Sequence, residues 1–202
     1  MGKTCNGGNL YNKYESKNPL VKLLMRKFFT DFESIVDPIK NEVDKALDIG
    51  CGEGYVTKYI HDMGINVEGA DVSEDVIELA KIRYPEIKFT VKSIYELSKH
   101  KEIYDIVFAI EVLEHLDFPR KAVEELKKVS RKYIFISVPN EPFFRLANVL
   151  RLKYLRNLGN TPGHVNHWTI WSFRRFLESC KLEIIKFKVS ILWLMALCKV
   201  CR

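Results

Sequence analysis

Residues 47–60 read LDIGCGEGYVTKYI. A short apolar run typical of a buried strand leads into Gly50, Gly52 and Gly54, and a helical pattern follows at once. Glycine permits a tight turn and lets a ligand approach the backbone closely, while the first turn of a helix offers free N–H groups. The stretch therefore predicts a strand, a ligand-binding loop and a helix in succession.

The spacing of these glycines distinguishes between kinds of nucleotide site. A dinucleotide-binding loop has the pattern G-x-G-x-x-G, in which the third glycine stands one position later than Gly54. Tyr55 occupies that position, so the loop departs from the dinucleotide pattern. Asp48 lies inside the motif, and a buried carboxylate beside the glycines suits a ligand that carries an ammonium group. A purely structural turn would need neither the acid nor three alternating glycines.

Short β-branched runs alternate with helical stretches along most of the chain, which indicates an α/β domain with a mostly parallel sheet. Strands are predicted at residues 46–49, 66–70, 88–91, 103–110, 133–138, 182–189 and 192–200. Helices are predicted at residues 19–36, 54–63, 74–83, 119–130, 143–158 and 171–180. The last two strands have a short connection, which predicts a closing antiparallel hairpin. Ser73 is predicted to cap the helix that follows it.

The composition suits one globular domain. Of the 202 residues, 47% are hydrophobic and 29% are charged, which excludes a disordered chain. The net charge of +6 is unevenly distributed, since residues 1–142 hold 21 Lys/Arg against 24 Asp/Glu. Residues 143–177 hold six basic residues and no acidic one. This excess predicts a substrate or partner with negative charge, although a covering helix whose basic side chains reach solvent explains it equally well.

No targeting signal is evident in the chain. The first 16 residues lack the apolar core of a signal peptide. The longest apolar run near the C-terminus, residues 191–198, is shorter than the roughly 20 residues that span a bilayer. The five cysteines form no even disulfide framework, and Cys198 and Cys201 are interpreted as reduced thiols. A cytoplasmic protein is therefore expected.

LDIGCGEG resembles the first motif of class I S-adenosylmethionine-dependent methyltransferases, and the chain is similar to their type 11 and ubiquinone-biosynthesis O-methyltransferase-like group. The resemblance implies an α/β, Rossmann-like fold: a mostly parallel seven-stranded sheet with a C-terminal antiparallel strand and helices on both faces. It implies one domain over residues 1–202. Its expected parts are an N-terminal helical lid (1–40), a cofactor-binding core (41–142), a helical substrate-lid insertion (143–181) and a closing hairpin (182–202).

The resemblance also implies the residues that bind S-adenosylmethionine. Asp71, about 20 residues beyond the glycines, would accept hydrogen bonds from both ribose hydroxyls. The family often has a Gly-Asp pair that contacts adenine, whereas Ser93 and Ile94 stand here and would offer a hydroxyl and a backbone N–H. The full expected set is Asp48, Gly50, Cys51, Gly52, Gly54, Asp71, Val72, Ser93, Ile94 and Glu111.

EVLEH, residues 111–115, follows the predicted central strand, and His164 follows later in PGHVNHWT. If a helix begins here, Glu111, Glu114 and His115 share one face. Three interpretations remain open. In the first, Glu111 packs against the cofactor and the rest is a solvated helix. In the second, His115 or His164 is a general base for a hydroxyl, because imidazole titrates near neutrality.

In the third interpretation, Glu111, Glu114, His115 and His164 bind a divalent cation that activates a chelated hydroxyl. Mixed oxygen and nitrogen ligands would suit magnesium, manganese, iron or zinc. Ubiquinone-biosynthesis O-methyltransferases, which act on a catechol, are similar across EVLEH. Small-RNA 3′-end 2′-O-methyltransferases are similar in a Glu-x-x-Glu-His segment and a later histidine, matched here by His164 ahead of a Trp-Thr pair.

The predicted function is O-methylation of a small, anionic molecule, with Glu111, His115 and His164 as the catalytic residues. One alternative is a metal-assisted RNA 2′-O-methyltransferase. Another is a non-catalytic regulator that binds S-adenosylmethionine. An RNA end and a membrane surface are the alternative anionic partners for the basic segment.

Overall fold

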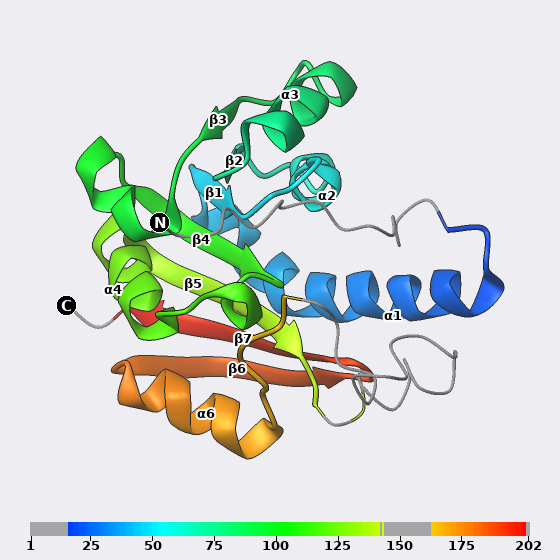
Figure 1. Cartoon of the computed structure of the whole chain (residues 1–202), viewed down its shortest axis with the longest axis vertical. Coiled ribbons are helices and arrows are strands. Elements are labelled where there is room, and N and C mark those ends of the chain that lie inside the picture. The colour runs from blue at the N-terminus through cyan, green and yellow to red at the C-terminus, as the bar shows by residue number, and fades with distance from the viewer. Residues whose placement is uncertain (1–15, 142, 144–162, 201–202) are drawn as a thin grey trace.

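A computed structural model describes residues 16–141, 143 and 163–200 (Figure 1). Its strands are β1 (Ala46–Ile49), β2 (Val67–Asp71), β3 (Phe89–Val91), β4 (Tyr104–Ile110), β5 (Ser130–Pro139), β6 (Leu182–Ser190) and β7 (Trp193–Val200). Its longer helices are α1 (Pro19–Val36), α2 (Tyr55–Asp62), α3 (Glu74–Arg83), α4 (Pro119–Val129) and α6 (Ile170–Ser179). Short 3₁₀ helices are η1 (Asp37–Glu42), η2 (Ile94–His100) and η3 (Leu113–His115). Nearly all of the helix predicted at 143–158 lies outside the described residues.

The described strands form one seven-stranded sheet in the order β3-β2-β1-β4-β5-β7-β6. All neighbouring pairs are parallel except those of β7, which runs antiparallel to both β5 and β6. The predicted mixed sheet with a closing hairpin is confirmed, and strand ends differ from the prediction by up to three residues. The chain leaves β1 toward β2 and β3, then returns to β4 on the other side. This reversal places the carboxyl ends of β1 and β4 at the point where open α/β sheets bind ligands.

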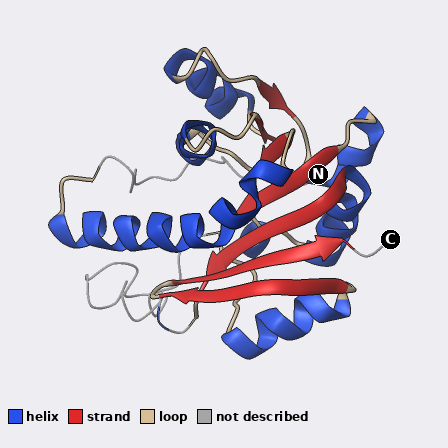
Figure 2. Cartoon of the chain, turned by 180° about the vertical axis from the view of Figure 1, so that it is seen from behind, coloured by secondary structure: helices blue, strands red, loops and turns tan. Residues whose placement is uncertain are grey.

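Helices cover both faces of the sheet (Figure 2). A hydrophobic core lies between the helices and the sheet on each face. Every residue of β4 is buried, as expected for a central strand. Because side chains alternate along a strand, Val107 and Ala109 pack in the core with α4 and α6, whereas Ile106 and Phe108 pack in the core with α1 and α2. The predicted helices on both faces are thereby confirmed.

Helix α1 belongs to the core of the domain. Pro19 stands in its first turn, and the Asn18 side chain caps the helix by accepting the N–H of Leu20 at 2.9 Å. Its apolar stripe includes Phe32, whose ring contacts Phe108 and Phe135 at centroid distances of 5.8 and 5.0 Å. The helix therefore crosses one face of the sheet, and the first 15 residues of the predicted lid lie outside the described part of the chain.

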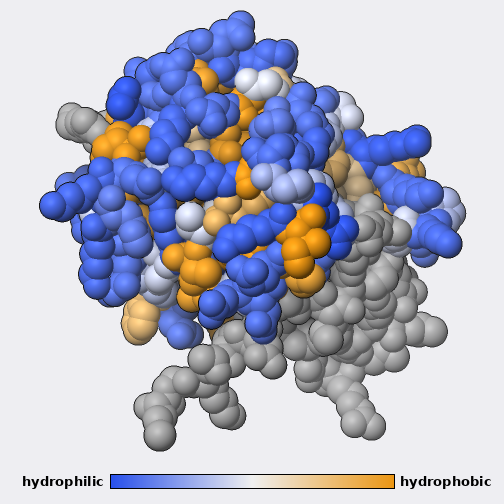
Figure 3. All heavy atoms as spheres, turned by 90° about the horizontal axis from the view of Figure 1, so that it is seen from above, coloured by the Kyte–Doolittle hydropathy of each residue, from blue (hydrophilic) through white to orange (hydrophobic). Residues whose placement is uncertain are grey.

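The described residues on the face in Figure 3 are mostly hydrophilic, with separate apolar patches among them. None of the described helices is long and apolar enough to cross a bilayer.

Candidate functional site at the carboxyl ends of the strands

The glycine loop after β1 is closely packed on one side and open on the other. Gly50 has φ +76, and a Cβ atom there would lie 2.4 Å from the Val112 side chain. Gly52 has φ +53, and a Cβ there would meet no atom of the described residues within 4 Å. Both positions have backbone conformations that favour glycine. The loop therefore rests on the segment after β4 and exposes its backbone at Gly52 to a space that a ligand could enter.

Asp71 ends β2 beside this loop. One carboxylate oxygen accepts the N–H of Gly52 and the other accepts the N–H of Ser73, each at 3.0 Å. A carboxylate has about four acceptor positions, so this one can also receive two hydroxyl groups. Ser73 occupies the predicted N-cap position of α3, but its side chain makes no capping hydrogen bond, and its N–H donates to Asp71. Asp71 and the open face of Gly52 thus fit the ribose end of S-adenosylmethionine.

Asp48 lies beneath the loop, with 1% of its surface exposed. The Thr57 hydroxyl of α2 donates to its carboxylate at 2.7 Å. Burial raises the pKa of Asp48 to about 7; the Thr57 hydrogen bond opposes this rise and the nearby charge of Asp71 adds to it. The Asp48 side chain therefore joins β1 to α2, and any effect on a ligand's ammonium group would act across the glycine loop.

The remaining predicted cofactor residues occupy the same strand edge. Val72 is 69% exposed and leaves an apolar surface beside Asp71. The Ser93 hydroxyl accepts the N–H of Tyr95 at 3.3 Å and so caps η2, while Ile94 is buried. Burial raises the pKa of the Cys51 thiol well above its usual range, which keeps it protonated.

No α-helix begins at EVLEH, so the condition for a shared helical face is not met. Glu111 has φ +57, and only Leu113–His115 form a single 3₁₀ turn. The N–H of Glu111 still bonds to the carbonyl of Ser137 on β5 at 2.9 Å, which extends the strand pairing before the chain turns. Glu111 therefore does not share a helical face with Glu114, and its carboxylate instead accepts the indole N–H of Trp193.

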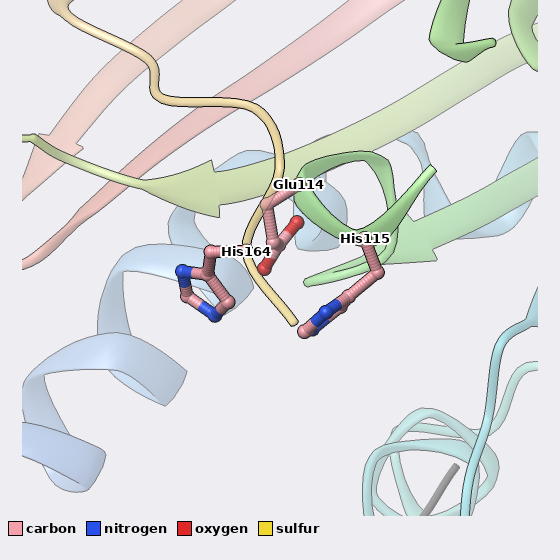
Figure 4. Close-up of side chains that lie close together, drawn as sticks. All are labelled: Glu114, His115 and His164. Carbon is pink, nitrogen blue, oxygen red and sulfur yellow. The ribbon is translucent and has the colours of Figure 1, made fainter. Parts of the chain in front are cut away.

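Glu114, His115 and His164 come together next to this turn. The candidate ligand atoms of the three side chains lie within 4.8 Å of one another, and Figure 4 shows the carboxylate between the two imidazole rings. Glu114 is 1% exposed, whereas His115 is exposed and His164 is half-buried. Three of the four predicted metal ligands are thus assembled, and among the described residues Glu111 is not part of the group.

A short segment fixes His164 against η3. The N–H groups of Val165 and Asn166 donate to the carbonyl of Glu114 at 2.9 and 3.1 Å. The Asn166 side-chain amide donates to the carbonyls of Leu113 and Leu116 at 3.0 and 2.6 Å. Sequence reasoning missed Asn166, because its partners lie about 50 residues earlier in the chain.

The contact between His115 and Gly163 determines which imidazole nitrogen is available. Nδ1 of His115 lies 3.1 Å from the carbonyl oxygen of Gly163. A carbonyl only accepts, so Nδ1 carries the proton in the neutral ring and the lone pair lies on Nε2. The same arrangement is common for histidines that bind a metal or take a proton.

A family model described as a methyltransferase domain matches residues 20–186. The chain belongs to this family. Methyltransferases of class I share the sheet order and glycine loop described above, and S-adenosylmethionine is their cofactor. The predicted family, fold and cofactor are confirmed by these comparisons.

The curated relatives of this methyltransferase include ubiquinone biosynthesis O-methyltransferases. The mitochondrial protein of Candida albicans is 34% identical over 132 residues, which are 59% of this chain and 40% of the relative. The protein of Hydrogenovibrio crunogenus is 30% identical over 126 residues, 58% of this chain and 49% of the relative. The mitochondrial protein of Dictyostelium discoideum is 25% identical over 194 residues, which are 87% of this chain and 54% of the relative. The chain spans about half the length of these relatives.

Solved structures of several methyltransferases share the fold. Magnesium protoporphyrin IX methyltransferase from Synechocystis, with bound S-adenosylhomocysteine, has a TM-score of 0.68 at 18% identity and covers 92% of this chain and 89% of its own. PH0226 from Pyrococcus horikoshii has a TM-score of 0.69 at 16% identity, and the match covers 92% of this chain and 93% of PH0226. The methyltransferase domain of bacterial CtHen1 has a TM-score of 0.63 at 20% identity, with 87% and 99% covered.

Proposed function

We propose that this methyltransferase transfers the methyl group of S-adenosylmethionine to a hydroxyl oxygen of a small, anionic molecule. The observation that carries the proposal is the cluster of Glu114, His115 and His164, which lies just after β4, the strand next to the glycine loop of β1. Imidazole and carboxylate groups at this position suit the removal of a hydroxyl proton. The curated relatives, named as O-methyltransferases, support an oxygen acceptor.

The chain's own residues would bind and orient the two reactants. S-adenosylmethionine supplies a methyl group bonded to a positively charged sulfur, and the sulfur keeps the carbon–sulfur bonding pair when the methyl group is transferred. The reaction therefore needs no covalent enzyme intermediate. Asp71 would hold the ribose through its remaining acceptor positions, and the Gly52 backbone would border the cofactor. Correct orientation of the two partners accounts for a large part of the rate in such transfers.

His115 would take the hydroxyl proton of the acceptor. As the acceptor oxygen forms its bond to the methyl carbon, the proton would pass to Nε2, which carries the ring's lone pair when Nδ1 donates to the Gly163 carbonyl. The neighbouring Glu114 carboxylate would stabilise the resulting imidazolium. His164, whose ring centroid lies 4.8 Å from that of His115, would border the acceptor on its other side.

The basic residues between 143 and 177 support an anionic substrate, and most of them lie outside the described residues. One of the described basic residues, Arg174, supports the alternative that these side chains cover the domain without binding substrate. The Arg174 guanidinium lies over the Phe187 ring at 4.1 Å from its centroid and thus packs on the sheet edge. The experiment must therefore compare a charged acceptor with an uncharged one.

The experiment measures transfer of radioactive methyl groups to matched acceptors. We expect the chain to label a dihydroxybenzoate faster than uncharged catechol, and both faster than a short RNA. His115→Gln should lower transfer at least tenfold, whereas His61→Gln, at a half-buried histidine in α2 outside the cluster, should have no effect. Preferential labelling of RNA would favour the RNA 2′-O-methyltransferase. Binding of S-adenosylmethionine without transfer to any acceptor would favour the non-catalytic regulator.

The second candidate is a metal-assisted form of the same reaction. The oxygen of Glu114 and the nitrogens of His115 and His164 fit the mixed donor set of magnesium, manganese, iron or zinc. A bound cation would lower the pKa of a chelated hydroxyl. Titration with Mn²⁺ should show one site that is lost in His164→Ala and kept in His167→Ala. Full activity after treatment with a chelator would exclude the metal-assisted form and leave His115 as the base.

A further inference from the structure

We propose that Trp193 is a positioning residue that holds the Glu111 carboxylate beside the sulfonium of bound S-adenosylmethionine. The inference rests on the proposed function, because it concerns the same cofactor site. Trp193 opens β7, 82 residues after Glu111 in the chain, and its indole N–H donates to the Glu111 carboxylate. Neither the glycine motif nor EVLEH points to this partner.

The C-terminal hairpin brings Trp193 to the site. Strand β7 runs back along β5, so that Trp193 pairs with Pro139 at the carboxyl end of β5 (Figure 1). Asn140 fixes the hairpin turn there, since its N–H donates to the carbonyl of Leu192 at 2.8 Å and its side chain donates to that of Ile191 at 3.4 Å. The closing hairpin is thereby joined to the strand edge at which ligands bind.

Packing holds the indole in one orientation. Trp193 is 4% exposed, and its ring meets the Phe28 ring of α1 edge to face at a centroid distance of 5.1 Å. A buried indole in such a contact has little freedom to rotate. Its N–H therefore points in a direction set by the core, and the flexible Glu111 side chain takes its position from the indole.

The backbone of Glu111 is constrained as well. A non-glycine residue with φ +57 is unusual and is found where the surrounding structure enforces it, often at functional sites. The next residue, Val112, packs against Gly50 of the glycine loop. Glu111 therefore lies directly beside the loop, anchored through its backbone to β5 and through its carboxylate to Trp193.

Strand order indicates which part of the cofactor faces Glu111. Ser93 follows β3, Asp71 ends β2, the glycines follow β1, and Glu111 follows β4, in the spatial order of the strands. With the ribose at Asp71, the cofactor would extend over the glycines toward β4. The Glu111 carboxylate would then attract the positively charged sulfur, because opposite charges attract in a partly desolvated site.

The test compares S-adenosylmethionine with S-adenosylhomocysteine, whose sulfur is uncharged. Trp193→Phe keeps the ring and removes the N–H, and Glu111→Gln keeps the shape and removes the charge. Each variant should bind S-adenosylmethionine at least fivefold more weakly and S-adenosylhomocysteine less than twofold more weakly, by calorimetry. The double variant should be no worse than Glu111→Gln. Equal losses for the two ligands would overturn the inference, because a purely structural defect does not distinguish the charge on sulfur.

A second measurement needs no ligand or activity. The three tryptophans give three indole N–H signals in a ¹⁵N-labelled NMR spectrum. The signal lost in Trp193→Phe should move in Glu111→Gln, and an unmoved signal would overturn the contact. Trp171→Phe is the matched control, because that indole is 81% exposed, and it should alter neither affinity. Wild-type binding without methyl transfer would contradict the proposed function and leave the positioning role intact.

Discussion

Gly50 and Gly52 show how differently two glycines of one loop are constrained. Both have positive φ, but only Gly50 is pressed against a neighbour, the side chain of Val112. Both positions therefore favour glycine because of their backbone conformation, whereas only Gly50 is also restricted by contact with Val112. A substitution at each position separates the fold of the loop from its contact with a ligand.

Gly50→Ala should destabilise the protein by about 2–4 kcal/mol, because strain at positive φ adds to a clash with Val112. Gly52→Ala should cost only about 1 kcal/mol and should weaken binding of S-adenosylhomocysteine, since its methyl group enters the open space. Urea unfolding and calorimetry measure the two effects. Equal destabilisation by both variants would contradict the packing argument.

Asp48 makes stability depend on pH. Its pKa is raised to about 7 by burial, from an ordinary value of 3.8, so between pH 4 and pH 7 the folded chain holds a proton that the unfolded chain has released. The free energy of unfolding therefore loses this contribution as pH rises through 7.

Asp48→Asn removes the titrating group and should leave an acceptor for the Thr57 hydroxyl. Relative to this variant, the wild type should be more stable at pH 5 than at pH 8 by at least ~1 kcal/mol, since one pKa unit corresponds to 1.36 kcal/mol. Urea unfolding of both proteins at both pH values tests this. A stability difference that does not change with pH would show that Asp48 titrates normally.

At the scale of elements, polar side chains join segments that are distant in sequence. Burial raises the pKa of Asp31 on α1, but hydrogen bonds from Lys188 and Lys27 outweigh it and leave the pKa below its ordinary value. Lys188 lies on the edge strand β6, so this ion pair ties α1 to the end of the sheet. On the other face, Arg120 and Lys127 of α4 donate to carbonyls at the carboxyl end of α6, where positive charge is favourable.

The segment that carries His164 depends on Asn166. Asn166→Ala removes two hydrogen bonds to η3 and should cost about 1–3 kcal/mol. The amides of Val165 and Asn166, which bond to Glu114, should exchange with solvent faster in Asn166→Ala than in wild type. His167→Ala in the same segment should leave exchange unchanged. Unchanged exchange in the Asn166 variant would mean that the backbone bonds suffice to hold the segment.

At the scale of the whole molecule, one ligand would bridge the ends of β3, β2, β1 and β4 and so stabilise the sheet as a unit. A ligand at 100 times its dissociation constant stabilises the folded state by about 2.7 kcal/mol. S-adenosylhomocysteine should therefore raise Tm by roughly 5–10 °C for a domain of this size. Asp71→Ala should lose most of this shift, whereas Asp62→Ala, on an exposed turn of α2, should keep it. A full shift in Asp71→Ala would remove that residue from the ribose site.

The local sequence pattern was sufficient to predict most strands and helices of the fold. The strand and glycine loop at 46–54, the buried strand β4 and the closing hairpin follow from hydrophobic periodicity and turn residues, which act over a few positions. The cofactor edge was predictable for the same reason, because parallel strands present their carboxyl ends together. The helix that would have aligned Glu111 with Glu114 does not form, since β5 and the glycine loop constrain Glu111 and Val112 more strongly than helical spacing does.

The chemistry of the site depended on long-range packing. His164 reaches Glu114 and His115 across about 50 residues, held by Asn166, and Trp193 reaches Glu111 across 82. Such contacts are fixed by how strands and helices pack, and no periodicity in the chain encodes them. Sequence and the family resemblance thus identified a methyltransferase fold, its cofactor edge and the grouping of Glu114, His115 and His164. Only the tertiary structure showed that the Glu111 carboxylate bonds to the Trp193 indole and lies outside the glutamate–histidine cluster. The reason is that β7 pairs with β5 and brings Trp193 to the carboxyl end of that strand.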